Sequence, residues 1–600
     1  MIYTNWYGFD TENDKQGKVT LTALVSEEGG IDVWKRAGCF RQWCDDNKDD
    51  SPVVICHNLE YDLVNEFAEY YPYLNLTYLH GRLIMAKYGS VAFLDSFNHY
   101  RMPLWKIGKA FGIEKLKFDI NSPEYVATDA MICLKAMTFT RDYVQSLGGQ
   151  LGSTAGSTAM SVWLAMEGED YLTGPFDTPW LRRGYSGGRT EIFRRITKGE
   201  LLFDAAGKPV MIEDELNPGE QVQDRKASIK GFDVNSMYPY CMMTDYPMLT
   251  NEDPKMVKKK GMAECTVSVP HDMYVGPLVS RDAGGRLVYP VGVFKGIWTY
   301  DELAYANSIG VQILKVHKAI GGNYTERPFD HFIETVYARR KASTNPAERE
   351  VLKVILNSLY GKLASKSTIT RVVSKYNLLK NGSTRMDDVK WIDHNRGLLD
   401  FTTPQQRYVN VLWGAMITAN ARVLLTKYLR QVPPEKLVYC DTDSVYVNDF
   451  DLPTSDDLGG LKLEKSAKVM KVLQPKVYQL DSFFKAKGVP KPREVKREDY
   501  EASWGKVEGW LPGLSVPKPI MKGESTIVLD YARSFMEEGL AEFEAPLRFR
   551  QSIGSKRGKV NQWIMQSKSM RSEYTAKKLS GDRYYPPVLG QQQEMVLTAT

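Results

Sequence analysis

Short runs of β-branched and aromatic residues, separated by turn residues, characterise the hydrophobic pattern of this chain. The clearest example is residues 437–447, where two such runs flank the polar centre Asp441-Thr-Asp-Ser444. This pattern predicts two strands joined by a tight turn that carries the carboxylates. Two Asp residues this close repel each other unless a cation binds, and Mg²⁺ typically uses one or two protein carboxylates together with substrate phosphates. An Asp that simply favours a turn is the alternative, and two further stretches argue against it.

A second acid follows another predicted strand. Residues 227–232 have a strand pattern, Asp233 stands at its end, and Ser236 is predicted to cap the helix that follows. Asp233 could meet the hairpin from a neighbouring strand. Asp233 and Asp441 would then hold two metal ions about 3.5–4 Å apart, the arrangement that clamps the attacking and leaving oxygens of an in-line displacement.

A helical pattern that begins at Asn345-Pro and runs through Leu363 supplies the third stretch. Lys353, Asn357 and Tyr360 fall on one face of this helix, with apolar residues mostly on the other side. Every packed helix has a polar face, so Lys353 alone would mean little. Together, the three residues suit a nucleoside triphosphate, with the lysine for phosphate charge and the tyrosine for stacking.

These three stretches resemble motifs A, B and C of the family B DNA polymerases, in the family's order. They read Asp233-x-x-Ser-Met-Tyr-Pro, Lys353-x-x-x-Asn-Ser-x-Tyr-Gly and Tyr439-x-Asp-Thr-Asp-Ser. Met237 stands where the family usually has leucine, a substitution of similar volume. The resemblance implies a multidomain α/β protein with a right-hand polymerase of palm, fingers and thumb.

The resemblance also assigns roles to residues of this polymerase site. Catalysis would rest on Asp233, Asp441 and Lys353, with Asp443 as a supporting acid whose direct ligation of metal is left open. The incoming nucleotide would contact Tyr238, Lys353, Asn357 and Tyr360, and the sugar packed on Tyr238 would have no room for a 2′-hydroxyl. Arg340 and Lys341 would add triphosphate contacts, although solvated helix charges explain them equally well. The metal ligands implied here are Asp233, Val234 and Asp441, and the ion is Mg²⁺, with Mn²⁺ as a substitute.

The composition sets the broad class. A chain of 600 residues with 43% hydrophobic and 25% charged residues is expected to be a soluble protein of two or more domains. No apolar run approaches the roughly 18–20 residues that span a bilayer, and no signal peptide pattern is seen. The seven cysteines show no Cys-x-x-Cys pair, so we expect reduced thiols, no zinc site and a cytoplasmic location.

The net charge of +5 is unevenly distributed. Residues 1–150 carry 15 basic and 20 acidic side chains, whereas residues 361–430 carry 12 basic and 4 acidic ones. A charged stretch often marks only a solvated face. A basic stretch directly after the Lys353 helix more plausibly follows a phosphate backbone.

Three pieces near the N-terminus resemble the motifs of the DEDDy-type 3′–5′ exonuclease on a ribonuclease H-like fold. They are Tyr7-Gly-Phe-Asp-Thr-Glu12, the strand and turn of residues 53–62, and Tyr125-Val-Ala-Thr-Asp129. The resemblance implies that Tyr125 orients the attacking water and that Lys117 closes over the scissile phosphate. Two metal ions would be held by Asp10, Glu12, Asp62 and Asp129, and the frayed 3′ end by His57, Asn58 and Tyr61. An inactive nuclease domain is the alternative, and the intact carboxylates and tyrosine argue against it.

Further DNA contacts are expected between and after these motifs. The Tyr185-Ser-Gly-Gly188 string resembles the Tyr-x-Gly-Gly element that coordinates the template between the two active sites, with a plain glycine turn as the alternative. Lys-x-Tyr and Lys-x-x-Gly elements after the palm hairpin resemble those that hold primer-terminus phosphates. The DNA-binding residues expected from these elements are Tyr185, Gly187, Gly188, Lys476, Tyr478, Lys485, Lys487 and Gly488.

Two insertions indicate which subgroup of the family B polymerases this chain resembles. They occupy about residues 254–328 and 365–408, the positions at which the protein-primed family B replicases of bacteriophages and linear plasmids carry theirs. In that subgroup the first insertion contacts the terminal protein, and the second wraps the DNA to give processivity and strand displacement. We therefore expect template-primer DNA, dNTPs and a terminal protein as partners, and a monomer. The alternatives are a DNA-primed family B polymerase and a nuclease or DNA-binding protein with an inactive polymerase domain.

The expected domain order follows from the same motifs. The exonuclease domain would cover residues 1–146 and a linker residues 147–190. The polymerase would cover residues 191–600, with the palm at about 191–253 and 409–484, the fingers at about 329–364 and the thumb at about 491–600.

Overall fold

The structure is a computed structural model that describes three stretches of the chain. It covers residues 540–546 and 563–569, and residues 5–487 except 14–18, 37, 48, 68–73, 80–81, 173–175, 195–196, 202–210, 215–227, 249–250, 253–258, 283–284, 367, 381, 383–384, 392–393, 395, 403–405, 469 and 481–482. Most of the expected thumb and Gly488 therefore lie outside the described residues. Within them, no helix is long and apolar enough to cross a membrane.

The chain divides into two compact units. The first comprises Met1–Phe176, Pro328–Asn410 and Pro546–Ile564, and the second comprises Asp177–Arg327, Val411–Ala545 and Met565–Thr600. The residues expected to form the fingers and the second insertion thus group with those expected to form the exonuclease domain.

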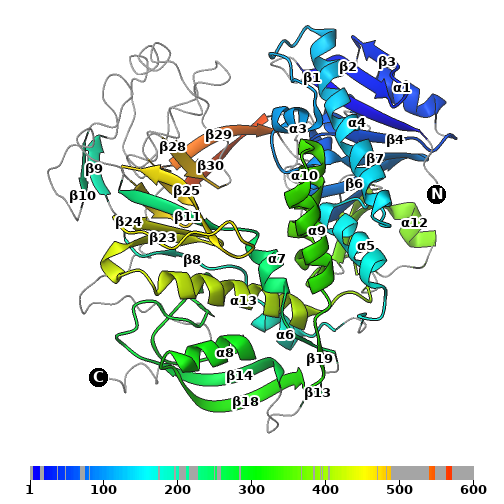
Figure 1. Ribbon diagram of the computed structural model, residues 1–600. Helices are drawn as coiled ribbons and strands as arrows, with labels where there is room; N and C mark the ends of the chain where they lie inside the picture. The colour runs from blue at the N-terminus through cyan, green and yellow to red at the C-terminus, as the bar shows by residue number, and fades with distance from the viewer. Residues whose placement is uncertain are drawn as a thin grey trace. The chain divides into compact units, whose positions relative to one another are not determined.

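A mixed ten-stranded sheet is the frame of the first unit (Figure 1). Strands β1 (Trp6–Asn13), β4 (Val53–Cys56) and β7 (Val91–Asp95) run parallel at its centre. Antiparallel strands extend the sheet on both sides. Beside β1 lie β2 (Val19–Ser26) and β3 (Ile31–Trp34), and beyond β7 follow β6 (Arg82–Tyr88), β5 (Asn75–Leu79), β20 (Thr368–Ser374), β22 (Arg396–Thr402) and β21 (Lys390–Trp391).

The second insertion therefore continues the sheet of the N-terminal domain. Strand β20 pairs with β5, with Thr370 opposite Tyr78 and Arg371 opposite Thr77. Leu398 of β22 packs into the same apolar core as Phe9, Phe40 and Phe93. Because both hydrogen bonds and apolar contacts join the two segments, the insertion is built on the N-terminal sheet.

Helices pack against this sheet. The long helix α4 (Pro123–Ser146) crosses β1 and β2, and Gly8 of β1 allows the close approach, because a Cβ there would lie 2.0 Å from the carbonyl oxygen of Ala130. Ser122 caps this helix by accepting from the amide of Tyr125. The other helices of residues 1–176 are α1 (Cys39–Asp46), α2 (Leu59–Phe67), α3 (Leu104–Phe111) and α5 (Ala155–Glu167).

The expected fingers consist of a helical pair in the first unit. Helix α10 (Pro346–Ser358) packs on α9 (Asp330–Ala342) and on α5. The predicted cap is confirmed, since the Asn345 side chain accepts from the amide of Ala347 at 2.9 Å. The helix ends at Ser358, five residues earlier than the pattern predicts, and the short helices α11 (Tyr360–Leu363) and α12 (Lys375–Lys380) follow.

The second unit is built on a five-stranded antiparallel sheet. Its order is β25 (Leu461–Ala467), β11 (Ile229–Val234), β24 (Ser444–Asn448), β23 (Leu437–Asp441) and β8 (Thr190–Ile192). Strands β23 and β24 form the predicted hairpin, and β11 is the predicted strand before Asp233. Helices α13 (Val411–Leu429) and α7 (Met237–Met242) accompany the sheet (Figure 1).

The cap predicted for α7 is wrong in one respect. Ser236 stands at the expected position, but its backbone is left-handed, with φ of 47°, and its side chain makes no capping hydrogen bond. The left-handed turn leads the chain directly from β11 into α7, and it leaves the hydroxyl away from the helix amides.

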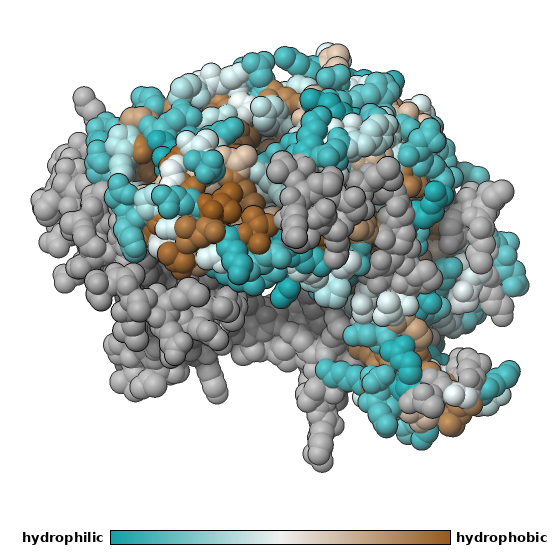
Figure 2. Space-filling model, turned by 90° about the horizontal axis from the view of Figure 1, so that it is seen from below, coloured by the Kyte–Doolittle hydropathy of each residue, from teal (hydrophilic) through white to brown (hydrophobic). Residues whose placement is uncertain are grey.

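The first insertion forms a sheet of its own. Its strands are β13 (Asn251–Glu252), β18 (Gln312–Gly322), β14 (Lys260–Val269) and β17 (Gly292–Thr299), with α8 (Tyr300–Ser308) packed against them. One face covers a core around Trp298. Exposed apolar side chains of β17 and β18 are Val293, Ile313, Leu314 and Val316, and apolar surface is seen in Figure 2 on the side where β14 and β18 lie.

One short helix and several short strands make up the rest of the described elements of this sheet region and of the chain after it. They are α6 (Pro179–Gly184), β9 (Thr197–Leu201), β10 (Met211–Asp214), β12 (Tyr246–Pro247), β15 (Ser280–Arg281), β16 (Leu287–Val288), β19 (Thr325–Glu326), β26 (Met470–Gln474), β27 (Val477–Leu480), β28 (Phe483–Ala486), β29 (Leu540–Pro546) and β30 (Trp563–Ser569).

Candidate active sites

The sheet of the second unit brings two acids of distant segments together. Asp233 of β11 and Asp441 of β23 both pair with Ser444, one from each side of β24. Directly opposed residues of antiparallel strands point to the same face of the sheet. The two carboxylates predicted to share metal ions therefore lie on one face, separated by a single strand.

The turn that follows Asp441 is held in an uncommon conformation. Thr442 has a φ of 64°, which a β-branched residue rarely adopts. Its amide donates to the carbonyl oxygen of Arg189 at 2.7 Å, and the Asp443 carbonyl accepts from the amide of Val234 at 2.8 Å. Hydrogen bonds from both neighbouring segments thus stabilise the turn, as expected where strain accompanies a functional site.

A cavity of about 360 Å³ opens over these carboxylates. It is lined by acidic and basic side chains together with the strand residues beneath them: Gly231, Phe232, Asp233, Asp441, Thr442, Asp443, Ser444, Tyr446, Glu464, Lys465, Lys476 and Lys485. The Nζ of Lys476 contacts Asp441. A space of this size with carboxylates on its floor and lysines on its wall fits metal ions and phosphates.

Without a bound cation, two of the acids in this cavity hold their protons more tightly than an ordinary carboxyl group does. Burial, followed by the nearby charges of Asp443 and Glu464, raises the pKa of Asp233 to about 7. Burial is also the main reason why the pKa of Asp443 is raised. A bound cation would reverse both effects because it favours the ionised carboxylates.

The expected Tyr-x-Gly-Gly string lies against this cavity. A Cβ on Gly188 would lie 2.8 Å from Cγ2 of Thr442 and 3.1 Å from the hydroxyl of Tyr238. Gly188 therefore lets the loop pack directly on the hairpin turn and on the tyrosine expected to exclude ribose. Tyr185 is largely enclosed, and burial raises its pKa.

Two buried arginines of the second unit were not predicted from the sequence. Arg189 donates to Glu191, to the carbonyl oxygen of Gly276 and to the hydroxyl of Thr426, with its guanidinium 3.8 Å from the ring centre of Tyr289. A buried arginine has no local pattern in the sequence, because its partners come from segments far along the chain.

The second buried arginine, Arg422 of α13, binds the Tyr-x-Gly-Gly string. It donates to Glu302 of the first insertion and to the carbonyl oxygens of Ser186 and Gly187. The guanidinium thus links helix α8 of the first insertion, helix α13 and the Tyr-x-Gly-Gly string.

The residues expected at the primer terminus lie on the three-stranded sheet β26–β27–β28. Lys476 stands in the turn between β26 and β27, with φ of 67°, and its amide donates to the hydroxyl of Tyr439. Tyr478 is buried beside Tyr446, and the Nζ of Lys485 lies 5.3 Å from its ring centre. Lys476 and Lys485 therefore reach the carboxylate cavity, while Tyr478 packs beneath it. Lys487 is exposed.

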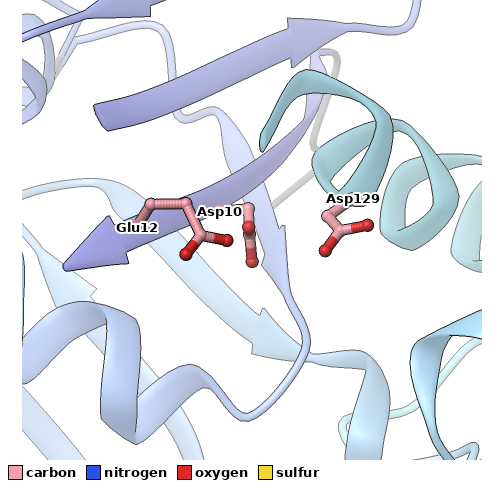
Figure 3. Close-up of side chains that lie close together, drawn as sticks. All are labelled: Asp10, Glu12 and Asp129. Atoms are coloured by element: carbon pink, nitrogen blue, oxygen red, sulfur yellow. The ribbon is translucent and has the colours of Figure 1, made fainter. Parts of the chain in front are cut away.

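The first unit holds a second group of acids. One oxygen from each of Asp10, Glu12 and Asp129 lies within 4.8 Å of the others. Figure 3 shows the three carboxylates turned toward one another, two from β1 and one from α4. Alternation along β1 places Asp10 and Glu12 on the same face.

Asp62 of α2 lies outside this group of three. Its Oδ1 accepts from the Thr11 hydroxyl at 2.9 Å, while its Oδ2 has no hydrogen-bond partner in the described part of the chain. Oδ1 of Asp129 is buried without a partner there as well. Buried carboxylate oxygens without donors are costly, and a divalent cation would satisfy them.

The pKa values of this cluster reflect the same crowding. Burial, then the charges of Asp62, Asp129 and Glu12, raises the pKa of Asp10 well above its usual range. Burial and Asp129 raise the pKa of Glu12 to about 7. All-oxygen ligands of this kind suit Mg²⁺ or Mn²⁺, so the residues fit the metal ions that the motifs imply.

A lysine two residues before the predicted Lys117 contacts one of these acids. Lys115, and not Lys117, contacts Asp129, and its Nζ lies 4.3 Å from the ring centre of Tyr125. Lys117 is exposed. Both lysines lie in a segment without regular secondary structure, and in this conformation the Lys115 side chain is the one that contacts the acids.

The residues expected to contact the 3′ end differ in how their polar groups are engaged. The ring of His57 is bound at both nitrogens, to the Ser96 hydroxyl at 2.8 Å and to the carbonyl oxygen of Met102 at 3.1 Å. Burial lowers its pKa to about 4, so the neutral ring donates from Nε2 to the carbonyl and accepts at Nδ1. Both nitrogens are occupied, so the contact with the 3′ end expected for His57 would have to be made by the face of its ring.

Two neighbours of His57 are more accessible. Asn58 is exposed. Its backbone has a left-handed φ of 74°, and its backbone N–H donates to the carboxylate of Asp95. The Tyr61 hydroxyl accepts from Asn13 at 3.0 Å. Both side chains remain candidates for contact with a strand end.

The triphosphate residues expected on the fingers belong to the first unit. Lys353 is half-exposed, with its Nζ 3.3 Å from Glu350 Oε1, and Asn357 is exposed on the same helix. Tyr360 begins α11. Burial lowers the pKa of Arg340, whereas Lys341 is exposed at the end of α9.

Comparison with known proteins finds a family that matches part of the chain. Residues 220–390 match the family of DNA polymerase type B, organellar and viral. This segment includes Asp233 and Lys353, the positions at which the motifs were recognised. Over this segment the chain is similar to the type B DNA polymerases of organelles and viruses.

Curated relatives align over different shares of their length. The chain is 28% identical over 278 residues to a probable DNA polymerase of Ascobolus immersus, covering 42% of this chain and 22% of that protein. It is 25% identical over 464 residues to the DNA-directed DNA polymerase of Enterobacteria phage PRD1, covering 74% and 75%. The DNA polymerase of Bacillus phage phi29 is 23% identical over 450 residues, covering 65% and 67%. The aligned region thus spans about a fifth of the fungal protein and most of the phage ones.

Solved structures support the polymerase fold. Phi29 DNA polymerase complexed with primer-template DNA superimposes with a TM-score of 0.60, at 18% identity, over 79% of this chain and 86% of that chain. A crystal form of the same polymerase gives 0.59 over 82% and 91%. The α/β multidomain fold expected from the motifs is therefore supported over most of the chain.

Proposed function

We propose that this protein is a DNA-directed DNA polymerase with a 3′–5′ proofreading exonuclease. The observation that carries the polymerase is the placement of Asp233 and Asp441 on either side of Ser444, on the floor of a cavity with lysine walls. The family match covers one of these two acids. The substrates are template-primer DNA and dNTPs.

Divalent cations, Mg²⁺ or Mn²⁺, would neutralise charge on the triphosphate and align the reacting oxygens. Asp233 and Asp441 would hold them, with the carbonyl of Val234 as a third ligand and Asp443 in support. Lys476 and Lys485 would neutralise phosphates of the primer terminus at the wall of the cavity. Lys353 would bind the triphosphate from the fingers. Positioning and charge stabilisation supply most of the catalysis in phosphoryl transfer.

The exonuclease would use the second set of acids. Asp10, Glu12, Asp62 and Asp129 are the metal ligands, and Tyr125 orients the attacking water. Lys115 lies where it can stabilise charge on the scissile phosphate. Lys117, predicted for that role, would bind a phosphate further along the strand. The ribonuclease H-like fold proposed for this domain is supported by the parallel strands β1, β4 and β7 at the centre of its sheet.

We place the enzyme in the protein-primed subgroup, as a processive, strand-displacing replicase of phage type. The β-rich first insertion and the second insertion built on the N-terminal sheet support this assignment. The terminal protein would be its partner, and the bacterial cytoplasm its location. A DNA-primed polymerase remains the alternative, and a protein-nucleotide adduct distinguishes the two.

Primer extension on a singly primed circle with Mg²⁺ tests the proposal. The wild type should give long strand-displaced products and degrade unpaired 3′ ends. Asp441→Asn should abolish synthesis alone, and Asp10→Asn should abolish degradation alone. Asp449→Asn and Asp32→Asn are matched controls, because both acids are exposed, Asp449 directly after β24 and Asp32 on β3, and neither change should affect either activity.

Two outcomes would contradict the proposal. Degradation without synthesis by the wild type would leave a nuclease with an inactive polymerase domain. Synthesis unaffected by Asp441→Asn would place the polymerase site elsewhere. Incubation of linear duplex DNA with labelled dNTP and no DNA primer tests priming, since a priming protein should acquire a covalently bound, alkali-labile nucleotide.

A further inference from the structure

An apolar and basic surface lies beside the exonuclease acids, and none of the motifs accounts for it. It consists of helix α3 and the segment after it, residues 112–118. Trp105 is 51% exposed, Leu116 44% and Phe118 67%. Within residues 5–172, as far as the structure describes them, only Ile31 is a comparably exposed large apolar side chain. Three such side chains within fourteen residues form an exposed apolar surface that needs an explanation.

The surface is hollowed. A cavity of about 590 Å³ is lined by Trp105, Lys109, Gly112, Ile113, Glu114 and Lys115. Gly112 ends α3 in a left-handed conformation, with φ of 76°, and this turn directs the following segment along one side of the cavity. The walls therefore combine an aromatic ring, an aliphatic chain and charged side chains.

The cavity connects with the catalytic acids through Lys115, which lines it. Lys115 contacts Asp129 and lies over the ring of Tyr125. Phe118 packs edge-on against the same tyrosine, with ring centres 5.6 Å apart. A strand whose end reaches Asp129 would thus pass the aromatic rings of residues 118 and 105.

The local charge is positive in an acidic domain. Residues 101–118 contain five basic side chains and one acidic side chain, Glu114, whereas residues 1–150 carry a net charge of −5. Lys106 stacks on Trp105, with Nζ 5.4 Å from the ring centre, and Lys109 and Lys117 are exposed. Positive charge with interleaved aromatic rings is the pattern that binds single-stranded nucleic acid without sequence preference.

We propose that this groove binds the single DNA strand that feeds the exonuclease, with Trp105 and Phe118 stacking bases and Lys106, Lys109 and Lys117 pairing with phosphates. The proposal rests on the exonuclease activity proposed above. It assigns the groove to nucleotides upstream of the 3′ end, whereas the acids and Tyr125 act on the terminal one.

Hydrolysis of single-stranded oligonucleotides of 2 to 12 residues tests the role of Trp105. The ratio of kcat/KM for the dodecamer to that for the dinucleotide should fall about tenfold in Trp105→Ala, since one base-aromatic stack is lost. Trp105→Phe should retain most of the ratio, because phenylalanine still stacks. Ile31→Ala, at a side chain that is also 51% exposed on the edge strand β3, should leave the ratio at the wild-type value.

Salt dependence tests the lysines. In buffer with EDTA, anisotropy of a labelled dodecamer reports binding without hydrolysis. Lys109→Ala should reduce the slope of log K against log salt by about 0.7, the value for one phosphate contact of a single strand. Lys135→Ala removes an exposed lysine of α4 and should leave the slope unchanged.

The outcomes separate this proposal from the exonuclease assignment. A wild type that binds the dodecamer through Trp105 but hydrolyses nothing would refute the exonuclease and keep the groove. An unchanged length ratio in an active Trp105→Ala enzyme would overturn the groove. So would a lowered melting temperature with unchanged DNA affinity, since Trp105 would then be a packing residue.

Discussion

The guanidinium of Arg422 donates to Glu302 on one side and to the Tyr-x-Gly-Gly loop on the other. Nη2 lies 2.7 Å from Oε1 of Glu302, and Nη1 lies 2.6 Å from the carbonyl oxygen of Ser186 and 2.9 Å from that of Gly187. The arginine side chain is 1% exposed and the glutamate 2%. The first insertion and the loop beside the polymerase carboxylates are therefore fixed through one buried ion pair.

Removing one charge of this pair should destabilise the protein and disturb the loop. Glu302→Gln leaves Arg422 buried without its counter-ion, and we expect about 3 kcal/mol of lost stability. Displacement of the loop should lower polymerase kcat/KM about 10- to 100-fold, because small misplacements of a site are costly. Thermal melts and single-nucleotide extension measure the two effects.

The control is a solvent-exposed pair. Asp451 binds Lys230 at 2.6 Å but is 75% exposed, so Asp451→Asn should cost under about 1 kcal/mol. Exonuclease activity on single strands should stay near wild type in Glu302→Gln. Equal losses of both activities would mean general unfolding and would contradict a local effect on the loop.

Gly188 is expected to be intolerant of any side chain. An added Cβ would lie 2.8 Å from Cγ2 of Thr442, and the turn that carries Thr442 cannot retreat without breaking its hydrogen bond to Arg189. Gly188→Ala should therefore lower nucleotide incorporation by about tenfold or more while sparing exonuclease activity. Thr442→Ser removes that methyl, so the double variant should recover part of the loss. No recovery would show that the clash is not with Thr442.

Much of the polymerase site could be predicted from local pattern alone. The hairpin of residues 437–448 and the strand before Asp233 follow from alternating β-branched residues and a polar turn, and the structure places both acids opposite Ser444. Pattern also gave the capped start of α10 at Asn345. Each of these features is determined within about ten residues of sequence.

Features that depend on distant partners could not be predicted. Arg422 looks like any helix residue until Glu302 and the loop carbonyls surround it. The strand pattern of β20 does not reveal that its neighbour is β5. The choice between Lys115 and Lys117 depends on how the irregular segment that carries both packs beside Asp129, and motif spacing alone does not determine this.

The two lysines give a direct test of that choice. Lys115→Met should lower exonuclease kcat by about 100-fold, because it removes the charge that contacts Asp129 beside the scissile bond. Lys117→Met should mainly raise KM for longer strands, since Lys117 is exposed. Steady-state kinetics on a dodecamer separates the two effects. The reverse order would restore Lys117 to the catalytic role that the motif implies.

Tyr238 is expected to select the sugar of the incoming nucleotide. Its hydroxyl lies near the Gly188 backbone, and this contact limits where the ring can move. Tyr238→Val should therefore raise ribonucleotide incorporation relative to deoxyribonucleotide incorporation by about tenfold or more, since steric exclusion of one oxygen is lost. Tyr240→Val is the matched control, because Tyr240 is exposed on the same helix. Unchanged sugar selectivity in Tyr238→Val would assign the selection to another residue.

Metal binding at both sites should strengthen as pH rises through 7. The metal-free protein holds Glu12 and Asp233 with pKa values of about 7, above the ordinary carboxyl range. A carboxyl group with a raised folded-state pKa binds protons more tightly folded than unfolded, so its ionisation destabilises the metal-free protein as pH rises from about 4.3 toward 7. Divalent cations need the ionised form and reverse this loss. The rise in melting temperature on adding Mn²⁺ should therefore be larger at pH 8 than at pH 6. Glu12→Gln should reduce the increment, and a Mn²⁺ effect independent of pH would contradict carboxylate ligation at these sites.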